Sequence, residues 1–240
     1  KPVTTQSISM FRRFCVKKSR VMQLSVNFIS QFSDNAAKTW PERAALVVGS
    51  QRWSFAELQQ QVVACRQLLS QTGIKAGDRL VLAAPKQLEL VVVLLAAVSL
   101  GAIIVPVHAQ LKPVQLAHVL QDCQATLLMT NQHRLTQLHD LQLPLPAFKV
   151  LLTETLAQSI ADIQKSGLSA VPAISTLVAS DVAAIMYTSG STGMPKGVVL
   201  SQQNLMLGTL SVSQYLHINH DDVVLALLPF SFDYGLNQLL

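Results

Sequence analysis

Segments with the helical period alternate with short apolar runs along most of the chain. The helical segments have apolar residues three or four positions apart, and the short runs between them are rich in Val, Ile and Leu. The predicted helices are 26–39, 55–72, 88–100 and 112–122, and the predicted strands are 44–48, 52–55, 79–83, 102–107 and 126–130. This order predicts an α/β fold with a mainly parallel sheet that is covered by helices.

Two short signals mark element boundaries early in the chain. The Gly49-Ser50 dipeptide predicts the turn of a hairpin between the first two strands. Ser54 stands three residues before Glu57, which is the spacing of a capping box. We therefore expect the next helix to begin directly after Ser54.

The periodic pattern weakens between residues 131 and 180, where Pro144, Pro146 and Pro172 interrupt it. We predict a connecting region there, with one short strand at 148–152. The predicted division of the chain is a basic tail at 1–21, a first α/β subdomain at 22–180 and the truncated start of a second subdomain at 181–240.

One apolar stretch is long enough to raise the question of a membrane. Residues 90–107 are 18 residues without a charge, which is the lower limit for a helix that crosses a bilayer. Gly101 and Pro106 interrupt the stretch, so it is more typical of a buried helix followed by a buried strand. We expect no transmembrane segment.

The formal net charge of +5 comes from the start of the 240-residue chain. The first 21 residues contain six of the 18 basic residues and no acidic one, which leaves 12 basic against 13 acidic residues for the remainder. A nucleic-acid-binding domain would carry its basic stripe on the folded part, so nucleic acid is not an expected partner. Because 50% of the residues are hydrophobic, the chain can bury a large core.

The basic tail has two interpretations. The natural protein could begin at Met22, with the upstream residues added or assigned in error. Alternatively, the tail is an amphipathic segment that is transit-like or touches a membrane, since Phe11, Phe14 and Val16 lie among the basic residues.

The three cysteines, Cys15, Cys65 and Cys123, are too far apart for a C-x-x-C site, and their number is odd. A disulfide framework is therefore not expected, and a cytoplasmic location fits best. We interpret Cys65 and Cys123 as small core residues.

The residue types best suited to bind a ligand are concentrated in the segment that follows a predicted strand at 183–187. The ten residues 188–197 contain four hydroxyl side chains, three glycines and Lys196. Glycines let backbone N–H groups turn inward, hydroxyls donate to phosphate oxygens and the lysine supplies a positive charge, so this loop suits a polyanion. A second strand at 198–200 and a helix capped by Ser201 follow, which favours a hairpin that closes over phosphates.

Two common phosphate motifs do not match this loop. A Walker A loop requires glycine directly before the lysine and Ser or Thr after it, whereas Pro195 and Gly197 stand there. The dinucleotide motif G-x-G-x-x-G is also absent.

The sequence YTSGSTGMPKGV at 187–198 closely resembles the signature phosphate loop of the AMP-forming adenylating enzymes. This family includes acyl-CoA synthetases, luciferases and the adenylation domains of peptide synthetases. Weaker matches at 53–58, 77–85 and 100–107 follow in the family's order. The resemblance implies that this chain is the N-terminal part of such an enzyme, an incomplete large domain.

The resemblance also implies a reaction and its cofactors. The family couples a carboxylate to ATP with Mg²⁺, releases pyrophosphate, and passes the acyl or aminoacyl group to a thiol of CoA or of phosphopantetheine on a carrier protein. The residues implied to hold the β- and γ-phosphates are Thr188, Ser189, Gly190, Ser191, Thr192, Gly193 and Lys196.

A second segment, 227–235, is implied to line the substrate pocket with Phe230, Phe232 and Asp233. Acyl-CoA synthetases usually have an aromatic-His pair here, whereas amino-acid-activating members have a Phe-Asp pair whose carboxylate meets the substrate ammonium. This chain has Phe232-Asp233, so an amino acid and a short or polar acyl acid both stay open as substrates. Asp233 could instead cap a helix that begins near Tyr234.

The histidines carry weaker signals. His217, His220, Asp221 and Asp222 could suggest a metal cluster, but this spacing at a helix end is more typical of a solvated turn, and we predict no metal site. His108 follows a predicted strand and is a candidate for lining the cleft.

The chain ends inside the pocket-lining segment, before the family's adenine-binding, metal-binding and hinge motifs. We therefore expect these 240 residues alone not to complete adenylation. The alternative is a nucleotide-binding or protein-interaction module without catalysis.

Overall fold

The computed structural model describes residues 29–167, 171, 176–189 and 194–240. The strands are β1 (Ala44–Val48), β2 (Gln51–Ser54), β3 (Arg79–Leu82), β4 (Ile103–Pro106), β5 (Leu127–Thr130), β6 (Lys149–Leu152), β7 (Val182–Ser189) and β8 (Pro195–Ser201). The helices are η2 (Ile29–Gln31), α1 (Phe32–Thr39), α2 (Phe55–Gln71), α3 (Leu88–Ser99), α4 (Pro113–Asp122), α5 (Gln132–His139), α6 (Thr153–Ser166), α7 (Gln202–Tyr215) and α8 (Asp233–Asn237).

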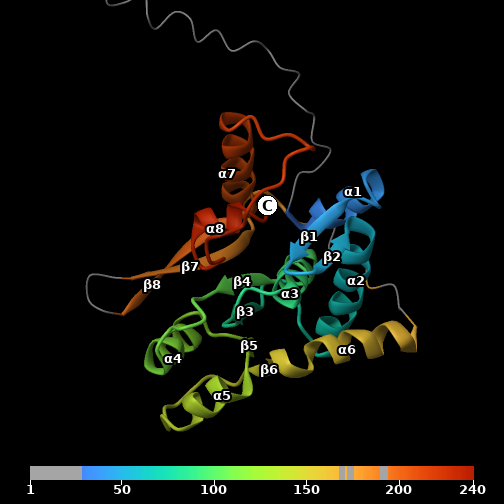
Figure 1. Cartoon of the computed structure of the whole chain (residues 1–240). Helices are drawn as coiled ribbons and strands as arrows, with labels where there is room; N and C mark the ends of the chain where they lie inside the picture. The colour runs from blue at the N-terminus through green and yellow to red at the C-terminus, as the bar shows by residue number, and fades with distance from the viewer. Residues whose placement is uncertain (1–28, 168–170, 172–175, 190–193) are drawn as a thin grey trace, which may run out of the picture.

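A six-stranded sheet in the order β6-β5-β3-β4-β7-β8 forms the centre, and β1 and β2 form a separate hairpin (Figure 1). Neighbouring strands from β6 to β7 are parallel, and β8 alone in this sheet runs antiparallel to its neighbour. The predicted α/β fold with a mainly parallel, helix-covered sheet is therefore confirmed.

The two faces of the sheet bury different helices. Leu80 and Leu82 of β3 belong to the larger apolar cluster, which includes residues of α2, α3 and α6. Val81 points to the other face and joins a smaller cluster with residues of α4 and α5. Because side chains alternate along a strand, a central strand that is covered on both faces needs consecutive apolar residues, as Leu80, Val81 and Leu82 are.

Helix α3 accounts for the uncharged stretch at 90–107. Its residues from Leu90 to Ser99 are all buried, and the chain turns at Gly101 into β4, whose last three residues are buried too. In the part of the chain that the structure describes, no helix is long and apolar enough to cross a membrane.

The two helix starts predicted from capping residues, at Ser54 and Ser201, are confirmed. The Ser54 amide donates to Glu57 Oε2 at 2.7 Å, and the Glu57 amide donates to Ser54 Oγ at 3.2 Å, which completes the capping box of α2. Ser201 caps α7 in the same way, with Asn204 as the reciprocal partner. These bonds satisfy amide groups that have no partner inside the helix.

The connecting region predicted between residues 131 and 180 is wrong in part, because two helices lie there. Asn131 caps α5, since its side chain accepts the amide of Arg134 at 2.8 Å. Helix α6 presents Leu156 and Ile160, four residues apart, to the larger cluster. Pro144 and Pro146 lie between α5 and β6, so they interrupt the pattern without excluding the helices on either side. Pro172 lies outside the described residues.

Strands β7 and β8 share the central sheet with the earlier strands, since β4 pairs with β7 in parallel and β7 pairs with β8. The division into subdomains near residue 180 stays a prediction. The first helix was expected from residue 26; the structure begins with η2, and residues 26–28 and the tail at 1–21 lie outside the described residues.

Candidate functional site

The parallel strands bring the candidate residues to one edge of the sheet. Strands β3, β4 and β7 are parallel, so their carboxyl ends meet at the same edge. Lys86 and His108 follow the first two of these ends, and the phosphate loop follows the third. Ligands of open α/β sheets gather at this edge.

Strands β7 and β8 form the predicted hairpin, here called the phosphate hairpin (182–201). Thr188 pairs with Lys196 across the strands, and the next pair is Ser189 with Pro195. The Thr188 hydroxyl donates to the Lys196 carbonyl at 3.5 Å. Both Thr188 and Lys196 are exposed, so both can reach a bound anion. The turn residues Gly190, Ser191, Thr192 and Gly193 lie outside the described residues.

The faces of β7 orient these two side chains. Ala184 and Met186 join the larger cluster, which also contains Phe230, whereas Ile185 and Tyr187 pack on the smaller one. By alternation, Thr188 lies on the face of the larger cluster, and its pair partner Lys196 lies on the same face. The hydroxyl and the ammonium group therefore lie on the side of the sheet that carries Phe230.

The opposite face of the hairpin touches α4. His118 Nε2 lies 3.0 Å from the Pro195 carbonyl oxygen, and the Tyr187 hydroxyl donates to Asp122 Oδ2 at 2.5 Å. Burial, first, and the hydrogen bond to Asp122 raise the pKa of Tyr187, so its hydroxyl stays a donor at neutral pH. Sequence reasoning missed both contacts.

The candidate pocket segment has one buried and two exposed members. Phe230 is 5% exposed and belongs to the larger cluster, whereas Phe232 is 57% exposed and Asp233 is exposed too. Helix α8 begins at Asp233, whose Oδ1 accepts the amide of Tyr234 at 2.7 Å. The N-cap residue of α8 is Phe232 and no side-chain cap hydrogen bond is present, so the alternative expectation that Asp233 caps this helix is wrong. The contact of the carboxylate with a substrate stays a prediction.

Lys86 holds this segment, and sequence reasoning did not identify it. Its ammonium group donates to the Ala226 carbonyl at 2.7 Å and to the Leu228 carbonyl, and it lies 4.6 Å from the centre of the Phe230 ring. Burial lowers the pKa of Lys86. The hydrogen bonds and the cation–π contact fix the chain that leads into Phe230.

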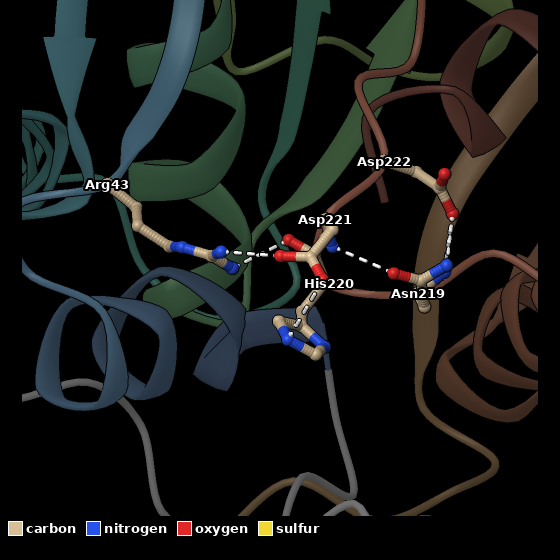
Figure 2. Close-up of polar contacts among 5 residues, drawn as sticks. All are labelled: Arg43, Asn219, His220, Asp221 and Asp222. Carbon is tan, nitrogen blue, oxygen red and sulfur yellow. Dashed lines mark hydrogen bonds and ion pairs between the residues drawn. The ribbon is translucent and has the colours of Figure 1, made fainter.

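Three of the four residues first considered for a metal, His220, Asp221 and Asp222, make other contacts. Arg43 donates to Asp221 Oδ1 at 2.6 Å and to the His220 carbonyl at 2.7 Å, and Asp222 accepts from the Asn219 side chain (Figure 2). The described residues include no group of three or more His, Cys, Asp or Glu that could hold a metal ion. This cluster ties the loop before the pocket segment to the chain next to β1.

His108 and the two cysteines lie apart from these contacts in the sequence. His108 is exposed, and its Nδ1 accepts the amide of Gln110 at 3.2 Å. Cys65 and Cys123 are free and buried, as predicted, and burial raises the pKa of their thiols to about 12 and about 11.

Comparison with known proteins decides the family of this chain. The family model described as AMP-binding enzyme matches residues 33–240. The chain belongs to this AMP-forming, adenylate-forming family. The match begins in α1 and includes the phosphate hairpin and the pocket segment.

The chain spans only a small part of the curated relatives that it matches. The chain is 32% identical to enterobactin synthase component F of Escherichia coli over 84% of its length, which is 14% of that protein. It is 29% identical to the hybrid PKS-NRPS synthetase poxE of Penicillium oxalicum over 88% of its length and 5% of that protein.

Solved structures share the fold. The complex of VinN with 3-methylaspartate has a TM-score of 0.80 at 24% identity, and the match covers 88% of this chain and 58% of VinN. A fatty acyl CoA synthetase of Mycobacterium tuberculosis has a TM-score of 0.78 at 22% identity, over 89% of this chain and 42% of that one. The chain thus has the fold of the N-terminal large domain of adenylate-forming enzymes and spans about half of these structures.

Proposed function

We propose that this chain is the N-terminal part of an ATP-dependent ligase that activates a carboxylic acid. In the proposed reaction, a carboxylate oxygen attacks the α-phosphate of ATP, an acyl- or aminoacyl-adenylate forms and pyrophosphate leaves. The phosphate hairpin carries this proposal, because Thr188 and Lys196 are paired and exposed at the carboxyl edge of the sheet. The family match over residues 33–240 supports it.

The donor set of the hairpin fits a triphosphate. A hydroxyl and an ammonium group both donate to phosphate oxygens, and neither repels an anion. Thr188 and Lys196 would position the β- and γ-phosphates and stabilise the charge that develops on the departing pyrophosphate. Ser189 and the residues 190–193 are proposed to add donors. Mg²⁺ would share this charge through phosphate oxygens.

We propose an amino acid as the substrate class ahead of a short or polar acyl acid. The Phe232-Asp233 pair supports this choice, because a carboxylate is well paired against a substrate ammonium and costly against a fatty chain. The curated relatives, which include a hybrid PKS-NRPS synthetase and an enterobactin synthase component, agree with it. The acceptor is proposed to be a thiol of CoA or of phosphopantetheine on a carrier protein.

Carboxylate-dependent exchange between ATP and pyrophosphate in the full-length protein tests the activity. A panel of amino acids, aryl acids and fatty acids should give exchange with at least one acid, and an amino acid should be best. Absence of exchange with every acid would count against carboxylate activation.

The Asp233→Ala variant tests the substrate class. We expect amino-acid-dependent exchange to fall at least tenfold, on the order of the loss of one charge-assisted contact, with an unchanged KM for ATP. Asp140→Ala, which changes another exposed aspartate, is the matched control. Amino-acid activation that persists at the wild-type rate in Asp233→Ala would refute the ammonium role.

A further inference from the structure

Helix α4 contacts the phosphate hairpin through two residues on one of its faces. His118 and Asp122 are four positions apart in a continuous helix, so their side chains lie one above the other. His118 reaches the Pro195 carbonyl, and Asp122 reaches the Tyr187 hydroxyl. Both contacts lie on the hairpin face opposite to the exposed side chains of Thr188 and Lys196.

The contact with Pro195 acts on the peptide group of the lysine. The Pro195 carbonyl and the Lys196 amide nitrogen belong to the same planar peptide unit. A bond from His118 Nε2 to this oxygen, at 3.0 Å, therefore fixes the plane from which Lys196 extends. Pro195 is buried and His118 is half-buried, so the contact is partly shielded from competing water.

The contact with Tyr187 acts on the other side of Lys196. Tyr187 pairs with Gly197 across the hairpin. A Cβ on Gly197 would lie 3.2 Å from Tyr187 Cζ and 2.9 Å from Ile185 Cγ2, so the tyrosine ring lies over β8 where only glycine leaves room. Asp122 thus holds the hairpin at residue 197 through the ring of Tyr187.

These anchors matter because the hairpin extends beyond its sheet contacts. Strand β4 pairs with β7 at Ile104 and Ala184, before the far end of the hairpin, and β8 is one of the two edge strands of the sheet. The pairs from Tyr187–Gly197 to Ser189–Pro195 hold the two strands to each other and not to the sheet. In Figure 1, α4 lies beside this far end of the hairpin.

We propose that α4 is a brace for the phosphate hairpin and that His118 and Asp122 are positioning residues. They fix the backbone at residues 195 and 197, on both sides of Lys196, and leave the lysine side chain free to meet a triphosphate. The identity of the ligand as a triphosphate rests on the proposed function. The brace itself is a property of the hairpin backbone and does not depend on the ligand. Without the brace, the triphosphate would have to order the hairpin on binding, at a cost in affinity.

Three variants separate the brace from other roles. His118→Leu removes the donor, His118→Gln can still donate an N–H from a similar place, and Tyr187→Phe keeps the ring and removes only the hydroxyl. His133→Leu, which changes an exposed histidine of α5, is the matched control. Melting temperatures identify any variant that is globally unfolded, and Tyr187→Phe, the smallest change, keeps the test decisive if His118→Leu does not fold.

Hydrogen–deuterium exchange of peptides that span residues 194–201 gives the first readout. We expect faster exchange in His118→Leu and Tyr187→Phe, and wild-type exchange in His118→Gln and His133→Leu. Wild-type exchange in both His118→Leu and Tyr187→Phe would overturn the brace.

Titration with inorganic tripolyphosphate and Mg²⁺ gives the second readout. Affinity should fall about five- to tenfold in His118→Leu and Tyr187→Phe, which corresponds to one hydrogen bond, and recover in His118→Gln. Lys196→Ala should weaken binding without faster exchange. If the wild-type chain does not bind tripolyphosphate, the proposed function fails while the exchange data still decide the brace; equal affinity in all variants would refute the positioning role.

Discussion

Lys86 illustrates how a single residue connects two distant parts of the chain. Its ammonium group donates to two carbonyls of residues 226 and 228 and lies over the Phe230 ring, although 140 residues separate Lys86 from Ala226. The ammonium group has no acceptor of its own, so every polar contact it makes uses its charge or its N–H groups. It therefore stabilises an extended segment that has few backbone partners.

We predict that Lys86→Met raises the KM for the carboxylate in the pyrophosphate exchange of the full-length protein about fivefold. The methionine keeps the apolar stem but removes the donors that hold the segment before Phe230. The KM for ATP should not change, because the contacts of Lys86 are with residues 226, 228 and 230 and the ATP phosphates are assigned to the phosphate hairpin. Lys75→Met, at another exposed lysine, is the control; an equal rise in both KM values in Lys86→Met would contradict the local role.

The ion pair of Arg43 and Asp221 gives a prediction on pH. The hydrogen bond from Arg43, followed by the charge of His220, lowers the pKa of Asp221 below its ordinary value of 3.8. A lowered pKa means that the folded state favours the ionised carboxylate. The stabilisation is therefore present above pH 3.8 and is lost as the pH falls through the folded-state pKa.

Carboxyl-carbon NMR of Asp221 measures this shift directly. In Arg43→Gln the pKa should rise toward 3.8, because the main cause of the shift is removed. Arg52→Gln, which changes a nearby exposed arginine of β2, should leave the Asp221 titration unaltered. An unchanged pKa in Arg43→Gln would show that the ion pair does not form in solution.

At the scale of elements, local sequence signals predicted most helices and strands. The same signals could not predict contacts between residues far apart in the sequence. The capping boxes at Ser54 and Ser201 depend on residues three positions apart, so the sequence alone reveals them. Helices α5 and α6 were missed because nearby prolines outweighed a short apolar stripe. Contacts such as His118 with Pro195, which lie 77 positions apart, arise only when the sheet is assembled.

The capping box of α2 makes a quantitative prediction. Ser54→Ala should lower the free energy of unfolding by about 1 kcal/mol, because the Glu57 amide loses its acceptor. Ser54→Asp should retain most of the stability, since aspartate also accepts at this position. Urea unfolding followed by circular dichroism measures both variants; equal stability of Ser54→Ala and wild type would mean that the box contributes nothing.

At the scale of the whole molecule, the distribution of charge and the fold together limit the classes of ligand that we expect. The excess of positive charge lies in the first 21 residues, and the remainder is almost balanced, so no broad basic surface is expected on the folded part. The candidate site depends instead on one exposed lysine beside a hydroxyl-rich turn. The motif was predicted from the sequence because its residues are contiguous, whereas Lys86, His118 and Asp122 were not, because their partners are distant.

This chain covers only part of the solved structures that it matches, so the proposed activity is that of a longer protein. The chain matches 58% of VinN and 42% of a mycobacterial fatty acyl CoA synthetase. Adenylate formation is accordingly proposed for the full-length protein, and the phosphate hairpin is the part of that activity that this chain can test alone.

An NMR titration of the chain with magnesium ATP tests the central claim most directly, and it detects even weak binding. We predict that the amide signals of Thr188, Lys196 and Gly197 shift progressively, that Lys196→Ala abolishes these shifts, and that Lys75→Ala preserves them. Shifts that map away from the phosphate hairpin, or that persist unchanged in Lys196→Ala, would contradict the assignment of this hairpin as the triphosphate site.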